Sequence, residues 1–242
     1  DWSSSWPAAG TGATDAPTPT GAAEEKWVAK LKESSDWSTY VSEPITAGDY
    51  LFIAAGNSLY QRDAKTGDVV KSAKLVSAIS SVSRMAYAGG LVLVPLGDGR
   101  VQALTADALT TVWVSEKLPD GKGGAQQCQG NLTVSAGKVY FQTSAGWSGP
   151  GGYSVCLDLA TGRTIWKQQA VGTKANYYWT GMGVSGDYGF VGNMDGTVET
   201  VDLATGKSVS SLSLGASVRS GVTVAPGGKV IYVVSYDGYL HK

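Results

Sequence analysis

A repeated segment constrains this chain more than any other feature. SVCLDLATGRTIW at residues 154–166 returns 44 residues later as VETVDLATGKSVS, and related segments occur twice before it and once at the end of the sequence. The position four residues before the repeat's aspartate falls at Leu59, Val101, Ser154, Val198 and Leu240. A period of 42 to 53 residues, built only from strand-like segments, is typical of a β-propeller with one four-stranded blade per repeat. We therefore expect an all-β fold, a single β-propeller of five antiparallel blades.

The strands follow the same order in each repeat. A short strand comes first, and a strongly apolar strand follows as YLFIAA, LVLVPL, KVYFQT, YGFVGN or KVIYVV. A tight turn with Gly56–Asn57, Asp98–Gly99, Asp195–Gly196 or Asp237–Gly238 leads into the third strand. Glycine, asparagine and aspartate tolerate the positive φ angles of short hairpins, so the pattern predicts antiparallel pairing.

The third strand ends at an aspartate, and a Thr-Gly turn leads to the outer strand. We expect Asp158 and Asp202 to accept hydrogen bonds from the N–H groups of their own turns. Gly162 and Gly206 are expected to take a positive φ at no steric cost. Trp113 and Trp166 follow the aspartate position by eight residues, where a large ring can cover the neighbouring blade.

The second repeat departs from this pattern. Thr105 stands in place of the aspartate, and Ala108–Leu109 in place of Thr-Gly. We expect its turn to be less well specified than the others.

The repeat of "LD" followed by "xATGxxxW" resembles the PQQ-like (quinoprotein-like) propeller repeat of bacterial secreted and surface proteins. The N-terminal DWSSSWPAAGTG and the later W-x-x-K-L segment look like the lead-in to such propellers. The resemblance covers nearly the whole chain. It implies the fold and not the activity, because the family includes dehydrogenases, outer-membrane assembly scaffolds and uncharacterised surface proteins.

The two ends of the chain suggest how the ring closes. The fifth repeat reaches Lys242 within its third strand, so its outer strand is missing, and residues 27–31 offer one with Trp27. We expect residues 1–26 to be an extended lead-in, residues 27–242 to be the propeller and residues 27–31 to be the outer strand of the last blade. Pairing of this kind covers two open sheet edges. Five blades are fewer than the seven or eight usual in the family, so a piece of a larger propeller is the alternative.

Charge and hydropathy limit the partners. Lys plus Arg total 19 and Asp plus Glu total 20, a balance that gives no electrostatic reason to expect nucleic acid or an anionic membrane. No apolar run approaches the roughly 20 residues that cross a bilayer. The sequence begins at Asp1, which fits a removed signal peptide or an excised piece. We expect an extracellular or cell-surface monomer.

The residues that carry chemistry are sparse. Resemblance to the quinoprotein dehydrogenases implies a PQQ pocket, a calcium ion with carboxylate ligands and an adjacent Cys-Cys pair, whereas Cys128 and Cys156 lie far apart. The only histidine is His241, and no Gly-x-Ser-x-Gly elbow lies between a strand and a helix. We expect no catalytic residue, no cofactor and no metal. The sequence leaves two alternatives open for the cysteines: a disulfide between them, or two separate thiols.

Aromatic residues gather in loops that a propeller places on one face. The candidate binding face consists of Trp37, Trp147, Tyr177, Tyr178 and Trp179. These rings either plug the mouth of the channel or form a platform for a protein, peptide or glycan. The expected function is a non-catalytic binding or scaffolding module. A carbohydrate-binding propeller is the alternative, and a degenerate quinoprotein dehydrogenase is a third.

Overall fold

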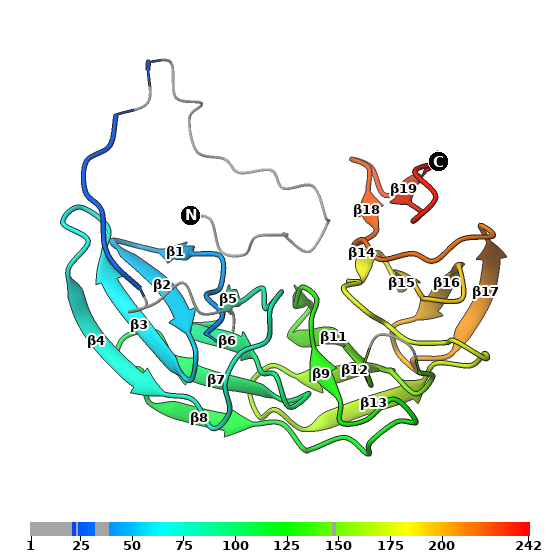
Figure 1. The fold of residues 1–242 in the computed structure, drawn as a ribbon, viewed down its shortest axis with the longest axis horizontal. Helices are drawn as coiled ribbons and strands as arrows, with labels where there is room; N and C mark the ends of the chain where they lie inside the picture. The colour runs from blue at the N-terminus through cyan, green and yellow to red at the C-terminus, as the bar shows by residue number, and fades with distance from the viewer. Residues whose placement is uncertain (1–20, 23, 32–38, 147–148) are drawn as a thin grey trace.

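The computed structural model describes residues 21–22, 24–31, 39–146 and 149–242, and every regular element within them is a β-strand (Figure 1). The strands form five antiparallel sheets, each of which is one blade. Strong β-formers such as Val, Ile and Tyr fill the second and third strands, and glycine turns separate them. The all-β class expected from the repeats is therefore confirmed.

The blades use the strands in chain order. The first contains β1 (Ile45–Ala47), β2 (Tyr50–Ala55), β3 (Ser58–Asp63) and β4 (Val69–Lys74). The second contains β5 (Ala86–Ala88), β6 (Leu91–Pro95), β7 (Val101–Thr105) and β8 (Thr111–Val114). The third contains β10 (Thr133–Ser135), β11 (Lys138–Ser144), β12 (Tyr153–Asp158) and β13 (Thr164–Gln169), with β9 (Gln127–Cys128) paired to β11. The fourth contains β14 (Gly183–Ser185), β15 (Tyr188–Gly192), β16 (Thr197–Asp202) and β17 (Ser208–Ser213). The last contains β18 (Thr223–Val224), β19 (Ile231–Val234) and β20 (Leu240–His241).

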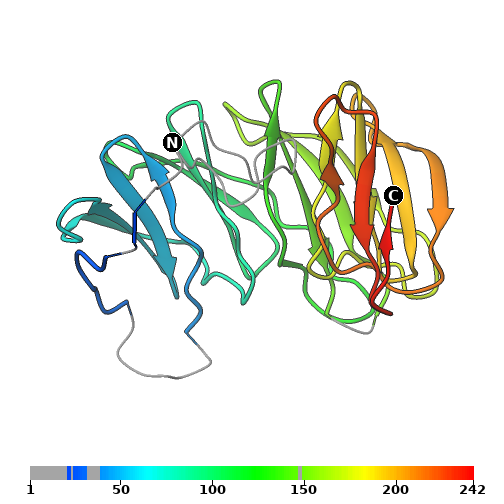
Figure 2. The same ribbon diagram turned by 90° about the horizontal axis from the view of Figure 1, so that it is seen from above.

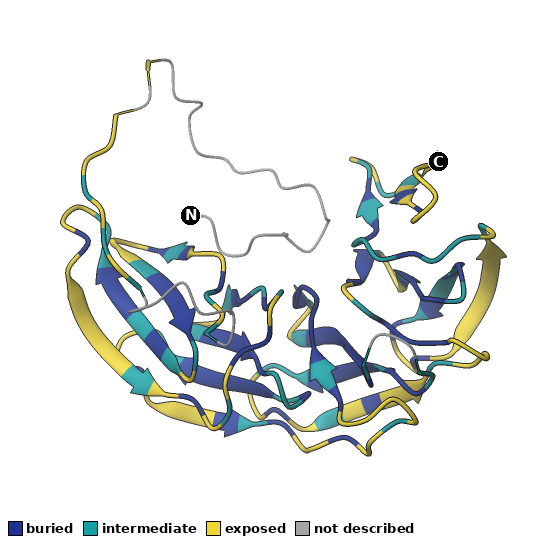
Figure 3. Cartoon of the chain, in the orientation of Figure 1, coloured by how far each residue is buried: buried dark blue, intermediate teal, exposed yellow. Residues whose placement is uncertain are grey.

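The blades stand side by side in an arc (Figures 1 and 2). The first strands of neighbouring blades contact one another in the order β1, β5, β10, β14 and β18. No comparable contact joins β18 back to β1 among the strands that the structure describes. The outer strands lie on the convex rim, where β4 and β17 are almost wholly exposed (Figure 3).

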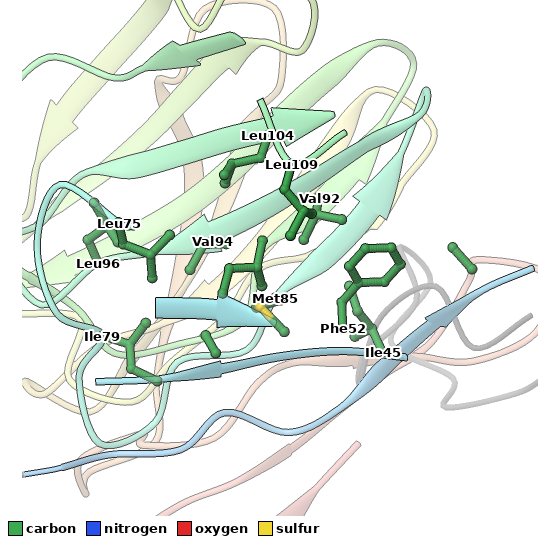
Figure 4. Packing of buried hydrophobic residues seen from close by; sticks show 13 residues of the cluster. Ile45, Phe52, Leu75, Ile79, Met85, Val92, Val94, Leu96, Leu104 and Leu109 are labelled. Carbon is green, nitrogen blue, oxygen red and sulfur yellow. The ribbon is translucent and has the colours of Figure 1, made fainter. Parts of the chain in front are cut away.

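The hydrophobic core is divided into layers between adjacent blades. Figure 4 shows the layer between the first two blades, where Phe52 and Ile45 meet Met85 and Val92. All four side chains are at most 1% exposed. Each blade is thus stabilised by the blades that flank it, as expected for a repeat architecture.

The turns after the third strands have the expected geometry. The carboxylate of Asp158 accepts from the Thr161 N–H at 2.9 Å, and Gly162 has a φ of 70°. The same bonds occur at Asp202, and Gly206 has a φ of 74°. In the first four blades the register shifts at the same place between the third and outer strands. The irregularity that precedes the turn is therefore part of the repeat.

The turn of the second blade corrects one expectation. Leu109 has a φ of 54°, and its N–H donates to the Thr105 carbonyl at 2.9 Å, as Gly162 donates to Asp158. The turn therefore has the same backbone bond and the same left-handed residue as the others, although its residue types differ. Leu109 is 5% exposed and packs in the layer between the first two blades, so burial of its side chain offsets the cost of a left-handed backbone.

Two tryptophans connect the turns of the third and fourth blades to the preceding outer strand. Trp113 Nε1 donates to the Leu159 carbonyl at 3.0 Å, and Trp166 Nε1 donates to the Leu203 carbonyl at 2.9 Å. Both rings lie over the turn glycine of the next blade. The prediction that these rings cover the neighbouring blade is confirmed.

The strand pairings of the described residues do not include the ring closure expected from the sequence. Residues 24–31 belong to no ladder, and β20 pairs only with β19 among the described strands. The ring of Trp27 lies over Gly67, and its Nε1 donates to the Ala64 carbonyl at 3.2 Å, which is the contact that Trp113 and Trp166 make with the blade after their own. The segment is therefore held on the first blade, while β18–β20 lie at the other end of the arc (Figures 1 and 2). The assignment of residues 27–31 to a last blade, the boundaries 1–26 and 27–242, and a closed ring of five blades stay predictions.

The two cysteines are separate thiols. Cys128 in β9 lies opposite Thr143, and Cys156 in β12 lies opposite Tyr140, so β11 runs between them. They belong to different layers of the core. Of the two alternatives left open by the sequence, the structure has the unbonded one.

Candidate binding face

The connection from β13 to β14 is fixed by a buried asparagine. The Asn176 side-chain oxygen accepts from the Ala145 N–H at 3.3 Å, and its nitrogen donates to the Gly146 carbonyl at 2.5 Å. These contacts tie the connection to the turn between β11 and β12. Two loops that are distant in sequence therefore lie together, as the propeller topology predicts.

Trp179 protrudes from this connection on a strained backbone. Its φ is 61°, and its side chain is 38% exposed. The next two residues are held firmly: Thr180 is fully buried, and a Cβ at Gly181 would stand 1.6 Å from the Asn131 side chain. Because its neighbours are packed against the third blade, Trp179 keeps a left-handed conformation that costs about 1 to 2 kcal/mol.

Three further side chains extend this surface toward the last blade. Tyr178 stacks on Trp179 with ring centroids 4.8 Å apart. The guanidinium of Arg219 lies 6.0 Å from the Tyr178 ring and 4.0 Å from the Tyr236 ring. Distances of this order allow cation–π attraction. We call Tyr178, Trp179, Arg219 and Tyr236 the aromatic–arginine cluster.

The blade repeat explains why these residues meet. Gly181 and Gly221 form a parallel bridge at the entrance to β14 and β18, and Trp179 and Arg219 each precede one of these glycines by two residues. They therefore occupy equivalent positions in adjacent repeats. Tyr236 comes from the β19–β20 turn. Its N–H donates to the Ser217 carbonyl at 2.8 Å, and this bond holds the turn beside the connection that carries Arg219.

A polar hollow lies at the connections of the first three blades. It has a volume of about 280 Å³ and is lined by Tyr40, Ser77, Ala78, Ile79, Ser80, Ser81, Gly97, Gln127 and Gln129. Gln129 precedes the first strand of its blade as Trp179 and Arg219 do. The hollow and the cluster thus belong to the same set of connections.

The structure brings together only part of the predicted face. Tyr178 and Trp179 are on the surface as expected, but Tyr177 is 3% exposed and packs in the core between the third and fourth blades. Its hydroxyl contacts Glu199 at 3.4 Å, and burial raises the pKa of Tyr177 above its usual range. Tyr177 is therefore a structural residue. Trp37 and Trp147 lie outside the described residues.

Sequence reasoning missed Arg219 and Tyr236. The connection that carries Arg219 contains no aromatic residue, and the Asp-Gly turn beside Tyr236 looked like an ordinary hairpin. An alignment of the blade-to-blade connections would have found Arg219, because it has the same offset from its strand as Trp179.

The titratable side chains of the described residues do not gather into a metal-binding group. No three His, Cys, Asp or Glu side chains in that part of the chain are placed to hold a metal ion. Burial raises the pKa of Cys156 to about 11 and that of Cys128 further, so both are neutral thiols near pH 7. The described part therefore offers no such ligand group for the calcium ion of the dehydrogenases that the repeat resembles, and we derive no step through their cofactor.

These features define a propeller built from PQQ-like repeats. Residues 10–187 match the model of a family described as outer membrane protein assembly factor BamB, and the chain belongs to that family. A comparison with curated protein sequences gives no match. No helix among the described residues is long and apolar enough to cross a membrane.

Solved structures agree on the fold. A quinohemoprotein alcohol dehydrogenase from Comamonas testosteroni matches with a TM-score of 0.69 at 17% identity, covering 82% of this chain and 40% of that one. A second, from Pseudomonas putida HK5, matches with a TM-score of 0.66 at 16% identity, covering 84% and 41%. A europium-containing methanol dehydrogenase matches with a TM-score of 0.65 at 15% identity, covering 83% and 48%. The chain spans less than half the length of these proteins, and the likeness concerns the fold.

Proposed function

We propose that this chain is a non-catalytic binding or scaffolding module that holds a ligand through the aromatic–arginine cluster. The observation that carries the proposal is Trp179, which remains 38% exposed although its backbone is held at a φ of 61°. Backbone strain of this kind persists where the surroundings impose it, and it concentrates at binding sites.

A peptide or protein partner suits the cluster best. Trp, Tyr and Arg are the residue types that supply most binding hot spots, and all three occur here side by side. Large rings bury much area with little loss of side-chain entropy. The family description, which refers to an outer-membrane assembly factor, is compatible with such a partner and with a site at the cell surface or outside the cell.

A glycan is the second candidate ligand. The exposed face of the Trp179 indole, supported from behind by Tyr178, is the observation that favours it, because sugar rings stack on flat aromatic faces. The two candidates share the residue on which they depend, so one set of variants tests both.

The experiment compares three proteins against two probes. Wild type, Trp179→Ala and Tyr50→Ala are each screened with a random-peptide phage library and with a glycan array. Tyr50 is the matched control because it is also an aromatic residue, 38% exposed, and it begins β2, at the end of the blade away from the cluster.

We expect peptides selected on the wild type to bind Trp179→Ala at least roughly 30-fold more weakly, the loss of a hot spot of about 2 kcal/mol. Tyr50→Ala should bind them normally, and both variants should melt as cooperatively as the wild type. Binding confined to the glycan array would support the second candidate. Absence of any ligand, together with a less stable Trp179→Ala protein, would contradict the proposal, because the rings would then only fill the mouth of the channel.

A further inference from the structure

The polar hollow at the connections of the first three blades is held in shape by bonds between those connections. The Gly97 N–H donates to the Ala78 carbonyl at 2.7 Å, and a Cβ at Gly97 would stand 3.0 Å from the same oxygen. Ser80 Oγ donates to the Cys128 carbonyl at 2.6 Å, which ties the connection between the first two blades to the entrance of the third. The lining comes from residues 40–129, away from both ends of the sequence. The hollow is therefore a feature of the fold itself.

Small side chains explain why these connections leave a hollow. The carbonyls of Ala78 and Asn176 each accept from an N–H in the turn between the second and third strands of the next blade, so the two residues are equivalent. The pair that stands two and three residues further on is Ser80–Ser81 here and Tyr178–Trp179 in the aromatic–arginine cluster. Two small hydroxyl side chains thus take the place of two large rings, and the space is left open.

One end of the Gln129 amide has no partner. Gln129 is 7% exposed and lines the hollow, and its side-chain oxygen accepts from Ser144 Oγ at 2.7 Å. Its nitrogen makes no hydrogen bond within the part of the chain that the structure describes. Ser144 is fully buried, so it holds the amide at its oxygen. The free N–H groups are therefore presented to the hollow from a fixed position.

Four more polar side chains of the hollow are free in the same way. They are Tyr40, Ser77, Ser81 and Gln127. None of them makes a side-chain hydrogen bond to another residue of the described ranges, and their hydroxyl and amide groups can both donate and accept. No charged side chain belongs to the described lining. Asp98, which follows Gly97, is paired with Arg100 at 2.6 Å.

These properties select the chemistry of a ligand. Without a carboxylate or a cation in its described lining, the hollow favours a neutral group. Most small-molecule sites are mainly apolar with few polar groups, and peptides are usually recognised along a sheet edge, in an apolar groove or by a cluster of charges. The hollow, of about 280 Å³, fits neither pattern. A sugar unit fits it better, because its neutral hydroxyls both donate and accept.

We propose that the polar hollow is a second binding site, separate from the aromatic–arginine cluster, and that it takes one neutral sugar unit. Gln129 donates to a sugar hydroxyl from the buried part of the site, and the exposed side chains of Ser81 and Tyr40 bond at its rim. The inference does not depend on the proposed function, because it needs neither Trp179 nor Arg219.

The test compares two substitutions in the hollow with one at the rim of the propeller. Ser81→Tyr places a ring in the hollow, and Gln129→Met keeps the length of the side chain but removes its amide. Ser72→Tyr is the matched control, because Ser72 is also an exposed serine and lies in β4 on the convex rim. Trp179→Ala is added to separate this site from the cluster.

The probes are four neutral sugars, namely glucose, galactose, mannose and N-acetylglucosamine, with glucuronate as a charged comparison. Binding is measured by titration with saturation-transfer NMR, in which magnetisation passes from the protein to the protons of a bound sugar. Thermal melts of all the variants show whether each one keeps its fold.

We expect at least one neutral sugar to bind the wild type, Ser72→Tyr and Trp179→Ala with equal affinity, and glucuronate to bind more weakly. Ser81→Tyr and Gln129→Met should each bind that sugar at least roughly tenfold more weakly, because one fills the site and the other removes its buried donor. If Gln129→Met melts less cooperatively, Ser81→Tyr decides, since its position is exposed.

Two results would overturn the inference directly: failure of all four neutral sugars to bind the wild type, or full binding by Ser81→Tyr. Loss of sugar binding in Trp179→Ala would also overturn it, because the sugar would then lie on the aromatic–arginine cluster. That last result would support the glycan candidate of the proposed function, so the two ideas fail separately.

Discussion

The indole of Trp166 bonds to the backbone carbonyl of Leu203 across the boundary between two blades, at 2.9 Å. Its ring atoms lie 2.5 Å from where a Cβ on Gly206 would stand. The same relationship joins Trp113 to the turn of the third blade. These contacts couple neighbouring blades at the rim, where none of the described strands pairs across the boundary.

Replacement of Gly206 tests this coupling. Gly206→Ala combines a left-handed backbone with a clash against Trp166, so we expect the free energy of unfolding to fall by clearly more than about 1 kcal/mol. Gly186→Ala is the control, because Gly186 has a φ of 56° and an added Cβ would meet nothing within 4 Å. Urea denaturation of both variants gives the comparison. Equal losses would mean that the ring does not confine Gly206.

The left-handed Leu109 should reverse the usual order of alanine and glycine. At an ordinary strand position such as Leu93 in β6, glycine is less stable than alanine by roughly 0.5 to 1 kcal/mol. At Leu109, where φ is 54°, we expect Leu109→Gly to be more stable than Leu109→Ala by about 1 kcal/mol. Chemical denaturation of the four variants decides the matter, and the same order at both positions would contradict the observed turn.

Acid should weaken the turns that end the third strands. The Thr161 side chain, followed by its backbone N–H, holds the pKa of Asp158 below its usual range, and Thr205 does the same for Asp202. Because the folded pKa is lowered, the contribution to stability is full above the unfolded value of about 3.9 and disappears as pH falls through the folded value.

The measurement is the free energy of unfolding between neutral pH and roughly pH 2. In the acid part of this range, the wild type should lose more stability than the double variant Asp158→Asn/Asp202→Asn. Parallel curves would show that these carboxylates do not contribute in this way.

The two cysteines should not react with a thiol reagent until the chain unfolds. Burial raises the pKa of Cys156 to about 11, and Cys128 is 1% exposed. A thiol reagent at about pH 8 should therefore not label the native protein. The unfolded, unreduced protein should react at both positions. A count of zero thiols would mean that the two cysteines are bonded.

The sequence predicted the parts of the fold that repeat. Each blade follows from an apolar second strand, a glycine hairpin and the aspartate turn, because these are local signals that recur with the period. The left-handed conformation of Leu109 was not predicted in this way, because it depends on burial of the side chain and is disfavoured by local backbone preference. The position of Trp27 was predicted only in part, because sequence cannot show which end of the arc holds the segment.

The candidate site was harder to predict than the fold. Tyr177 and Trp179 are two residues apart in one connection, yet one is core and the other surface. Their difference arises from Asn176 and Asn131, which pack the connection against another blade. Such contacts between repeats leave no pattern within a single repeat, and Arg219 was missed for the same reason.

The most direct test of the account follows Trp179 itself during binding. The protein is labelled with 5-fluorotryptophan, and the fluorine resonance of Trp179 is identified by its loss in Trp179→Phe. A peptide selected on the wild-type protein is then added to saturation. The account predicts that the Trp179 resonance shifts, while those of Trp113 and Trp166, which are both 7% exposed at the rim, stay in place. An unchanged Trp179 resonance at saturation would contradict the claim that this face binds the ligand.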